Sequence, residues 1–208
     1  MGVSKQQAAE NRKAILAASE KLFREHGIDG VGLNALMKAA GFTQGGFYNH
    51  FQSKEALAAE VVSSAMEKAN QDLVDALAAP LAPGGDRLQR QVDFYLSGIH
   101  CSDIEHGCAV AGLSADVRRL GEQAQANFAA GLNAMIEILA GPVAEHLPDD
   151  DNQEDVRRLA IGFCCEMVGA LILSRAVVSA DATFAQEIMA ASRGVLLDTF
   201  VHRKTTDE

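Results

Sequence analysis

The chain has 208 residues, 48% of them hydrophobic, and a formal net charge of −10. That length provides a sizeable hydrophobic core, and only four prolines interrupt the chain. Alternating strand patterns and β-branched runs are almost absent. The composition therefore excludes a β-rich fold and predicts an all-α protein.

The N-terminus is polar throughout, reading MGVSKQQAAENRK, and lacks the apolar segment and cleavage site of a secretory signal. No apolar stretch approaches the roughly 20 residues needed to cross a bilayer. We therefore expect a cytoplasmic protein with no membrane partner. In that compartment its four cysteines are expected to be reduced thiols, unless one of them is a sensor.

Charge is distributed unevenly along the chain. Residues 1–55 carry seven Lys or Arg against five Asp or Glu, a net +2, and the remainder carries eleven against 23, a net −12. This pattern is typical of a small anion-binding module attached to a body that must not bind anions. Chance variation in surface charge explains the same numbers equally well.

Three short helices are predicted at the N-terminal end of the chain. Residues 8–26 place apolar side chains on one helical face, and Gly27 is suited to end this helix. A short amphipathic helix covers residues 33–40. After a Gly-Phe turn, Thr43 can cap a third helix that begins at Gln44.

Six longer helices are predicted after these three. Ser53 can cap the first, which runs to about Ala79, and Glu55 in its first turn suits the helix dipole. The stretch APLAPGGD (79–86) is typical of a linker between helices. The others are expected over residues 86–101, 108–120, 122–146, 153–179 and 182–202, with the acidic turn LPDDD at 147–151.

The second and third predicted helices have the spacing of a helix-turn-helix. The later one is the candidate recognition element, with its first turn toward the major groove and its N–H groups toward phosphate. A glycine in a helix costs roughly 1 kcal/mol relative to alanine, yet Gly45 and Gly46 stand there side by side. We interpret them as bare backbone that approaches DNA; the alternative is that they only make a tight turn.

Polar and aromatic side chains surround these glycines. Gln44 can make a bidentate contact to adenine or a simpler bond to phosphate. Phe47 and Phe51 are interpreted as core anchors of the recognition element. Three phosphate-capable groups lie within seven residues, namely Tyr48, His50 and Lys54. The alternative for Tyr48 is a place in the core.

The run ILAASEKLFREHG…LMKAAGFTQGGFYNHFQSKEAL resembles the N-terminal DNA-binding domain of TetR-family transcriptional regulators. That family's pattern is a first helix ending in Leu-Phe and Gly, an Ala-Gly turn, then Ser/Thr-x-Gly-x-aromatic-Tyr-x-His-Phe and Ser-Lys-Glu. The resemblance implies a helix-turn-helix domain over 9–69 and a helical regulatory and dimerisation domain over 70–203. It places at the DNA Thr43, Gln44, Gly45, Gly46, Tyr48, Asn49 and His50, with Lys54 clamping a phosphate.

One departure from the family pattern precedes the second helix. The family usually has Thr or Ser there, capping the helix and touching phosphate, where this chain has Val31 and Gly32. Gly32 still suits a cap. Neither residue has the hydroxyl that makes this phosphate contact in the family pattern.

The resemblance implies a homodimer formed through the last two helices and a double-stranded operator read as a palindrome. Residues 156–178 are apolar on nearly every face, and such a helix needs burial on two sides. A monomer core and a dimer partner supply the two sides. Gly162 and Gly169, seven residues apart, can let two helices approach closely.

Cysteines mark a second region of interest, HCSDIEHGCAVAGL at 100–113. Cys101, His106 and Cys108 match no standard zinc spacing, so no metal site is expected. Cys108 near a helix N-terminus is a candidate reactive thiol. An alternative to a ligand-responsive regulator is therefore a redox or electrophile sensor acting through Cys101 or Cys108; the simpler interpretation is that both are small core residues.

The small-molecule inducer expected from the resemblance leaves no motif in the C-terminal helices. Each apolar candidate for its pocket also fits a plain core position. These candidates are Phe94, Tyr95, Cys108, Phe128, Met135, Phe163 and Met167. No phosphate loop, dinucleotide fingerprint, metalloprotease motif or nucleophile elbow is present, so we expect neither an enzyme nor a cofactor.

Overall fold

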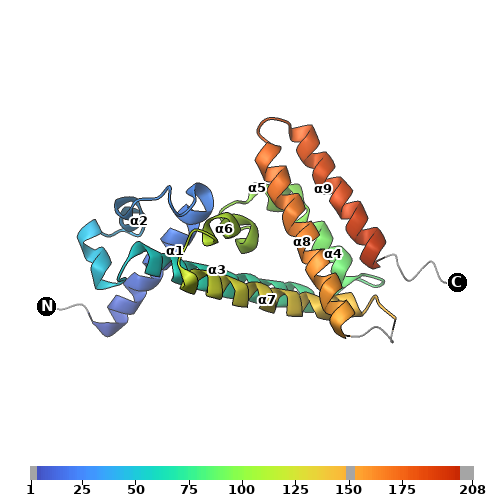
Figure 1. The fold of residues 1–208 in the computed structure, drawn as a ribbon, viewed down its shortest axis with the longest axis horizontal. Helices are drawn as coiled ribbons and strands as arrows, with labels where there is room; N and C mark the ends of the chain where they lie inside the picture. Colours follow the sequence, from blue (N-terminus) through green and yellow to red (C-terminus); the bar gives the residue numbers. More distant parts are fainter. Residues whose placement is uncertain (1–3, 149–152, 202–208) are drawn as a thin grey trace. The chain divides into compact units, whose positions relative to one another are not determined.

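The computed structural model describes residues 4–148 and 153–201, and each regular element in these ranges is a helix (Figure 1). The all-α prediction is confirmed. The described residues form two compact units, one made of 4–68 with 104–131 and the other of 69–103 with 132–148 and 153–201. Residues 104–131, assigned from sequence to the C-terminal domain, thus group with the N-terminal helices. The division into domains at residue 69 stays a prediction.

The first unit is built on the N-terminal helices. It contains α1 (Lys5–His26), α2 (Leu33–Ala39), the 3₁₀ helix η1 (Gln44–Asn49), the start of α3 (Lys54–Ala78), α6 (Ala109–Val117) and the start of α7 (Glu122–Ala144). Gly27 and Gly41 adopt φ of 72° and 83° at the ends of α1 and α2. Both predicted helix ends are confirmed, because only glycine adopts this left-handed backbone without strain.

The candidate recognition element differs from its prediction in two ways. It is a six-residue 3₁₀ helix and not an α-helix. The hydroxyl of Thr43 accepts no hydrogen bond from the turn, although the Thr43 carbonyl accepts from the Gly46 N–H at 3.0 Å. Two adjacent glycines and a short length explain the 3₁₀ geometry, since neither favours an α-helix.

A continuous apolar core holds the first unit together. Phe47 is fully buried and stacks on Phe51 with ring centroids 5.7 Å apart. The other fully buried large side chains come from α1, α2, α3 and α6 and include Ile15, Phe23, Leu36, Met37 and Leu57. The interpretation of Phe47 and Phe51 as anchors is confirmed, and η1 is held by apolar packing against α2.

The second unit contains the remaining helices. These are the end of α3, α4 (Arg87–Tyr95), α5 (Gly98–Ser102), the end of α7, α8 (Gln153–Val177), α9 (Ala182–Leu196) and the π-helix η2 (Leu197–Val201). Helices α8 and α9 lie side by side (Figure 1). The acidic residues 149–151 of the predicted turn, and the predicted helix end at 202, lie outside the described residues.

The prediction of one continuous helix over 86–101 is wrong. The chain leaves the helix at Leu96 and starts again at Gly98. Ser97 causes the restart, because its hydroxyl accepts the His100 N–H at 3.1 Å and so caps α5. Apolar periodicity continues through the break, which is why the pattern alone did not reveal it.

Two described helices, α7 and α8, are long and apolar enough by length and composition to cross a membrane. This corrects the expectation that no stretch approaches that length. The buried core helix of a water-soluble protein passes the same test. Arg157 on α8 pairs with Glu137 on α7, so charged residues interrupt both helices and bind each other across the bundle.

A buried carboxylate joins α6 to the turn after α1. Asp116 accepts the Ile28 N–H at 2.9 Å and also pairs with Arg119. Its side chain lies against Gly27, where an added Cβ would come within 3.2 Å of the carboxylate. Asp116 therefore satisfies a backbone donor that the end of α1 leaves buried.

Replacing Asp116 by alanine is expected to destabilise the protein by about 1–3 kcal/mol, because the Ile28 N–H stays buried without an acceptor. Urea unfolding measures the change. Asp29→Ala is the matched control, since it removes the exposed partner of the same arginine. Equal losses for the two variants would contradict the role given to Asp116.

Candidate nucleic-acid interface

The residues that the resemblance implies at DNA gather on and around η1. Five of them have exposed side chains or backbone, with Tyr48 at 69% exposure: Thr43, Gln44, Gly45, Tyr48 and Asn49. Gly46, His50 and Lys54 are half-buried. Phe47, between them, points into the core. The 3₁₀ helix thus has one face in the core and one polar face toward solvent.

The backbone conformation of η1 does not require glycine at either position 45 or position 46. Among the described residues, positive φ occurs at Gly27, Gly41 and Gly84, and not at Gly45 or Gly46. An added Cβ at Gly45 meets nothing within 4 Å, and at Gly46 it meets only the end of Met37 at 3.7 Å. A positive φ therefore does not explain either glycine, and the bare surface at Gly45 lacks any explanation from packing within the chain.

The first turn of α3 supplies the other half of this surface. The Ser53 hydroxyl accepts the Ala56 N–H at 3.1 Å, which confirms the predicted cap. A hydrogen bond from its own backbone N–H lowers the pKa of Glu55, and a hydrogen bond from the Ser53 side chain acts in the same direction. Lys54 begins the same helix. An anion beside Lys54 would therefore meet both an ammonium group and a helix N-terminus.

Cations of the first unit divide into paired and unpaired groups. Arg12 pairs with Glu60 and lies over the Phe51 ring at 4.6 Å, and Arg24 pairs with Glu20 at 2.7 Å. Lys21 bonds Glu105 at 2.7 Å, and this carboxylate raises the pKa of Lys21. Within the described residues no salt bridge is formed by the remaining lysines of this region, Lys5, Lys13, Lys38 and Lys54.

The proposed pocket residues do not come together in one described cavity. Phe94 is 59% exposed, whereas the side chains of Phe163 and Met167 are buried in the core. Tyr95 and Met135 are also buried, and Cys108 and Phe128 are half-buried. A cavity of the second unit is instead lined by Cys101 with residues that sequence reasoning did not single out, among them Ser174, Gln186 and Met189. Nothing in the sequence pattern marks these three.

The cysteine and histidine residues of the 100–113 stretch are spread over α5, the following turn and the start of α6. In the described parts of the chain, no group of three His, Cys, Asp or Glu side chains is arranged to hold an ion. His100 is buried, and its Nδ1 lies 2.7 Å from the Tyr95 carbonyl. Burial lowers the pKa of His100; Arg175 acts in the same direction, and the Tyr95 carbonyl acts against it. The ring is therefore neutral near pH 7 and donates its Nδ1–H to that carbonyl.

Comparison with known families matches residues 15–61 to the family described as "Bacterial regulatory proteins, tetR family". The HTH-type transcriptional regulator LmrA of Bacillus subtilis is 32% identical over 108 residues, which are 51% of this chain and 57% of LmrA. The chain thus spans about half the length of this curated relative. The HTH-type transcriptional regulator AcrR of Shigella flexneri is 40% identical over 58 residues, covering 28% of this chain and 27% of AcrR.

Solved structures share the fold of this chain over almost its whole length. Reduced E. coli NemR has a TM-score of 0.72 and 21% identity, with 91% of this chain and 96% of NemR covered. A TetR regulator of Chloroflexus aurantiacus has a TM-score of 0.74 and 20% identity, with 93% and 95% covered. Residues 15–61 thus belong to the tetR family of bacterial regulatory proteins, and the rest of the described chain shares the all-helical fold of solved TetR regulators.

Proposed function

We propose that this chain is a cytoplasmic, homodimeric transcriptional repressor that binds a palindromic operator and releases it when a small molecule binds the C-terminal helices. The single observation that carries DNA binding is the polar, exposed face of η1 with Gly45 bare at its centre. Bare backbone lets the element approach the groove floor. Gln44, Tyr48 and Asn49 then reach base edges or phosphates, and Lys54 holds a phosphate.

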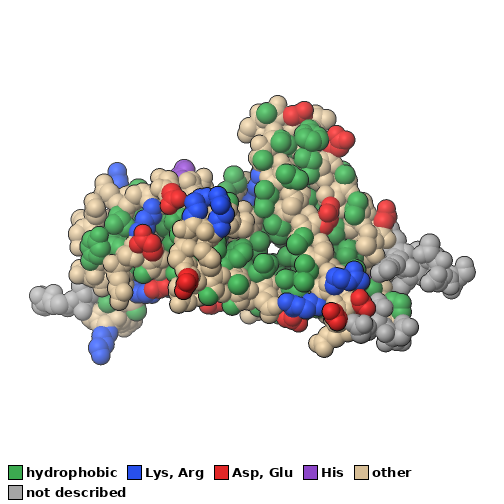
Figure 2. Space-filling view, viewed as in Figure 1, with side chains coloured by type: hydrophobic (Ala, Val, Ile, Leu, Met, Phe, Trp, Pro, Cys, Tyr) green, Lys and Arg blue, Asp and Glu red, His purple; other side chains and the backbone are tan. Residues whose placement is uncertain are grey.

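Besides the side that packs into the core, α8 and α9 have an apolar face that the single chain leaves uncovered. This face supports the homodimer. On α8, Ile161, Cys165, Gly169 and Ile172 follow one another at helical spacing and are not buried by the chain itself. Ile172 is 39% and its neighbour Leu173 58% exposed. On α9, Phe184 and Val195 are 47% and 56% exposed. Figure 2 shows hydrophobic side chains at the visible surface of this helix pair.

Glycines on the same face support close helix packing. An added Cβ at Gly162 or Gly169 meets nothing within 4 Å. These glycines therefore leave the surface open where a partner helix can approach. A patch of exposed apolar side chains with this spacing is typical of a protein interface. We infer that a second copy of the chain covers it, as in the four-helix bundle that the family resemblance implies.

The segment of residues 103–107 provides a route from the C-terminal helices to the DNA-binding unit. At one end, Arg175 of α8 donates to the carbonyls of His100, Cys101 and Asp103 at 2.9 to 3.0 Å. At the other end, Arg24 donates to the Gly107 carbonyl and Lys21 pairs with Glu105. Because five residues of chain join these two sets of bonds, movement of α5 would be carried to α1.

Energetics set a modest requirement for release. The inducer needs only a higher affinity for the conformation that releases DNA than for the conformation that binds it. A difference of about 3 kcal/mol in binding free energy is ample. A scattering measurement with and without inducer would detect the change in separation of the two DNA-binding units. Unchanged separation would count against this mechanism.

Fluorescence anisotropy tests the proposed function with DNA from upstream of this protein's own gene, against a shuffled control, over a salt series. We expect tighter binding to the upstream DNA and an affinity that falls as salt rises, because phosphate contacts release counterions. Equal and weak binding to both DNAs at every salt concentration would count against DNA recognition at this site.

A thiol sensor is the second candidate, favoured by the position of Cys108. Its sulfur accepts the Ala111 N–H at 3.4 Å at the N-terminus of α6, and its side chain is half-buried, not fully enclosed. In this case, Cys108→Ser keeps full DNA affinity and loses the release caused by hydrogen peroxide or N-ethylmaleimide. Release that persists in both Cys108→Ser and Cys101→Ser would rule out this candidate.

A further inference from the structure

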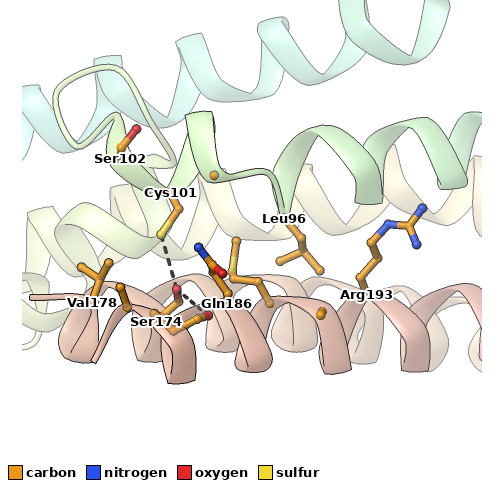
Figure 3. Close-up of a pocket in the computed structure, with 12 residues that line it drawn as sticks. Leu96, Cys101, Ser102, Ser174, Val178, Gln186 and Arg193 are labelled. Atoms are coloured by element: carbon orange, nitrogen blue, oxygen red, sulfur yellow. Dashed lines mark hydrogen bonds between the residues drawn. The ribbon is translucent and has the colours of Figure 1, made fainter. Parts of the chain in front are cut away.

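A cavity of about 470 Å³ lies within the second unit between α5, α8 and α9 (Figure 3). Its size falls within the range of about 300–1,000 Å³ that is usual for small-molecule sites. Leu96, Ala185 and Met189 form apolar walls and are almost fully buried. Gln186, Ala190 and Arg193 line it from the exposed side of α9 and mark the mouth.

The inner polar groups of this cavity bond one another. Ser174 donates its hydroxyl hydrogen to the Ala185 carbonyl at 3.1 Å. Cys101 Sγ lies 3.5 Å from Ser174 Oγ and points toward it, so the thiol donates to that oxygen (Figure 3). Both groups are thereby satisfied without a ligand. The interior therefore presents an apolar surface with no charge.

The charged group at the mouth is already paired. Arg193 binds Asp93 at 2.6 Å, and both side chains remain partly exposed. An anionic ligand would have to compete with Asp93 for this guanidinium. Gln186 forms no hydrogen bond within the described part of the chain, so its amide is the group at the mouth that can donate to a ligand.

The cavity and the proposed dimer face lie on different sides of α9. The lining residues 182, 185, 186, 189, 190 and 193 follow the three-and-four spacing of one helical face. Phe184 and Val195 of the apolar face are rotated from them by close to half a turn, given about 100° for each residue. A partner subunit seated on the apolar face therefore leaves the cavity to another occupant.

We infer that this cavity is the effector site and that it takes an uncharged, largely apolar small molecule with one polar end bound by Gln186. This inference rests on the proposed regulation by a small molecule. Three observations support it. The lining has no unpaired charge, and the volume suits a small molecule. Cys101 lines the cavity, and its backbone carbonyl accepts a hydrogen bond from Arg175 at the end of α5. A ligand that displaces Cys101 would strain these bonds and move the 103–107 segment.

Two fluorescent probes with one aromatic skeleton test the charge preference. N-phenyl-1-naphthylamine is neutral, and 1-anilinonaphthalene-8-sulfonate adds a sulfonate. We expect the neutral probe to bind once per chain and at least tenfold tighter than the sulfonate.

A substitution at the mouth tests the place of binding. Ala190→Phe, which fills the mouth, is expected to weaken binding of the neutral probe at least tenfold. Ala78→Phe is the matched control, since Ala78 is an exposed alanine of α3 in the same unit but outside the cavity, and it is expected to change affinity less than twofold.

Alkylation by N-ethylmaleimide, followed by peptide mass spectrometry, locates the probe. The neutral probe is expected to slow modification of Cys101 at least threefold and to leave the rate at Cys108, in the other unit, unchanged. Absence of neutral-probe binding, equal binding of the sulfonate, full binding in Ala190→Phe, or an unprotected Cys101 would each overturn the inference. Because operator binding is measured separately and without probe, failure here is distinguishable from failure of the proposed DNA-binding function.

Discussion

Enlarging the side chain at Gly45 is expected to abolish operator binding and leave the fold intact. An added Cβ at this position meets nothing within 4 Å, and its backbone has no left-handed conformation. Gly45→Ala and Gly45→Leu should therefore unfold at or above the temperature of the parent protein, since both residues favour a helix more than glycine does. Operator affinity should fall with side-chain size, by more than 100-fold for leucine, because bulk holds η1 away from the groove floor.

Gly41 provides the contrasting control for this series. Its φ of 83° requires a left-handed backbone, so Gly41→Ala should destabilise the protein by about 1–2 kcal/mol. Anisotropy and thermal unfolding of these variants separate an effect on DNA approach from an effect on folding. Parent-like affinity in Gly45→Leu would show that the backbone of η1 does not approach DNA closely.

Placing a charge on the apolar face of α8 is expected to convert the proposed dimer into a folded monomer. Ile172 is 39% exposed in the single chain, so Ile172→Glu disturbs little within it. In the proposed dimer the same carboxylate would be buried in the interface, and burial of an unpaired charge costs several kcal/mol. The operator affinity should fall at least tenfold, because two linked units then no longer bind the two half-sites together.

Sedimentation velocity and anisotropy measure the two parts of this result. Val74→Glu is the matched control, since Val74 has a similar exposure of 41% but belongs to α3. It should sediment as a dimer and bind the operator as the parent protein does. A dimeric Ile172→Glu protein would show that copies of this chain meet through another surface.

The sequence predicted the parts of the fold that depend on local signals. Gly27, Gly41 and Ser53 mark helix ends through backbone conformation and capping, and the structure confirms all three. The all-α class and the family also followed from the sequence, because the helix-turn-helix pattern is continuous along the chain. The exposure of Tyr48 and the burial of Phe47 agree with the roles assigned to them, although contacts with DNA stay a prediction.

Features that depend on distant residues were not predictable from the same pattern. The break at Ser97 sits inside a periodic apolar run, and the packing of η1 against α2 joins two separate elements. Asp116 bonds a backbone group 88 positions away, which no local spacing encodes. The cavity of the second unit likewise combines residues from α5, α8 and α9, whereas sequence reasoning selected large apolar residues that fill the core.

Selection of binding sites from a random double-stranded DNA pool, with the full-length protein, tests the central claim most directly. A homodimeric TetR-family repressor should enrich a two-fold symmetric motif whose half-sites are centred one helical turn, about 10.5 base pairs, or a multiple of it apart. The Gly45→Leu variant should enrich nothing under the same conditions. A motif without two-fold symmetry, or equal enrichment by the parent protein and Gly45→Leu, would contradict this account.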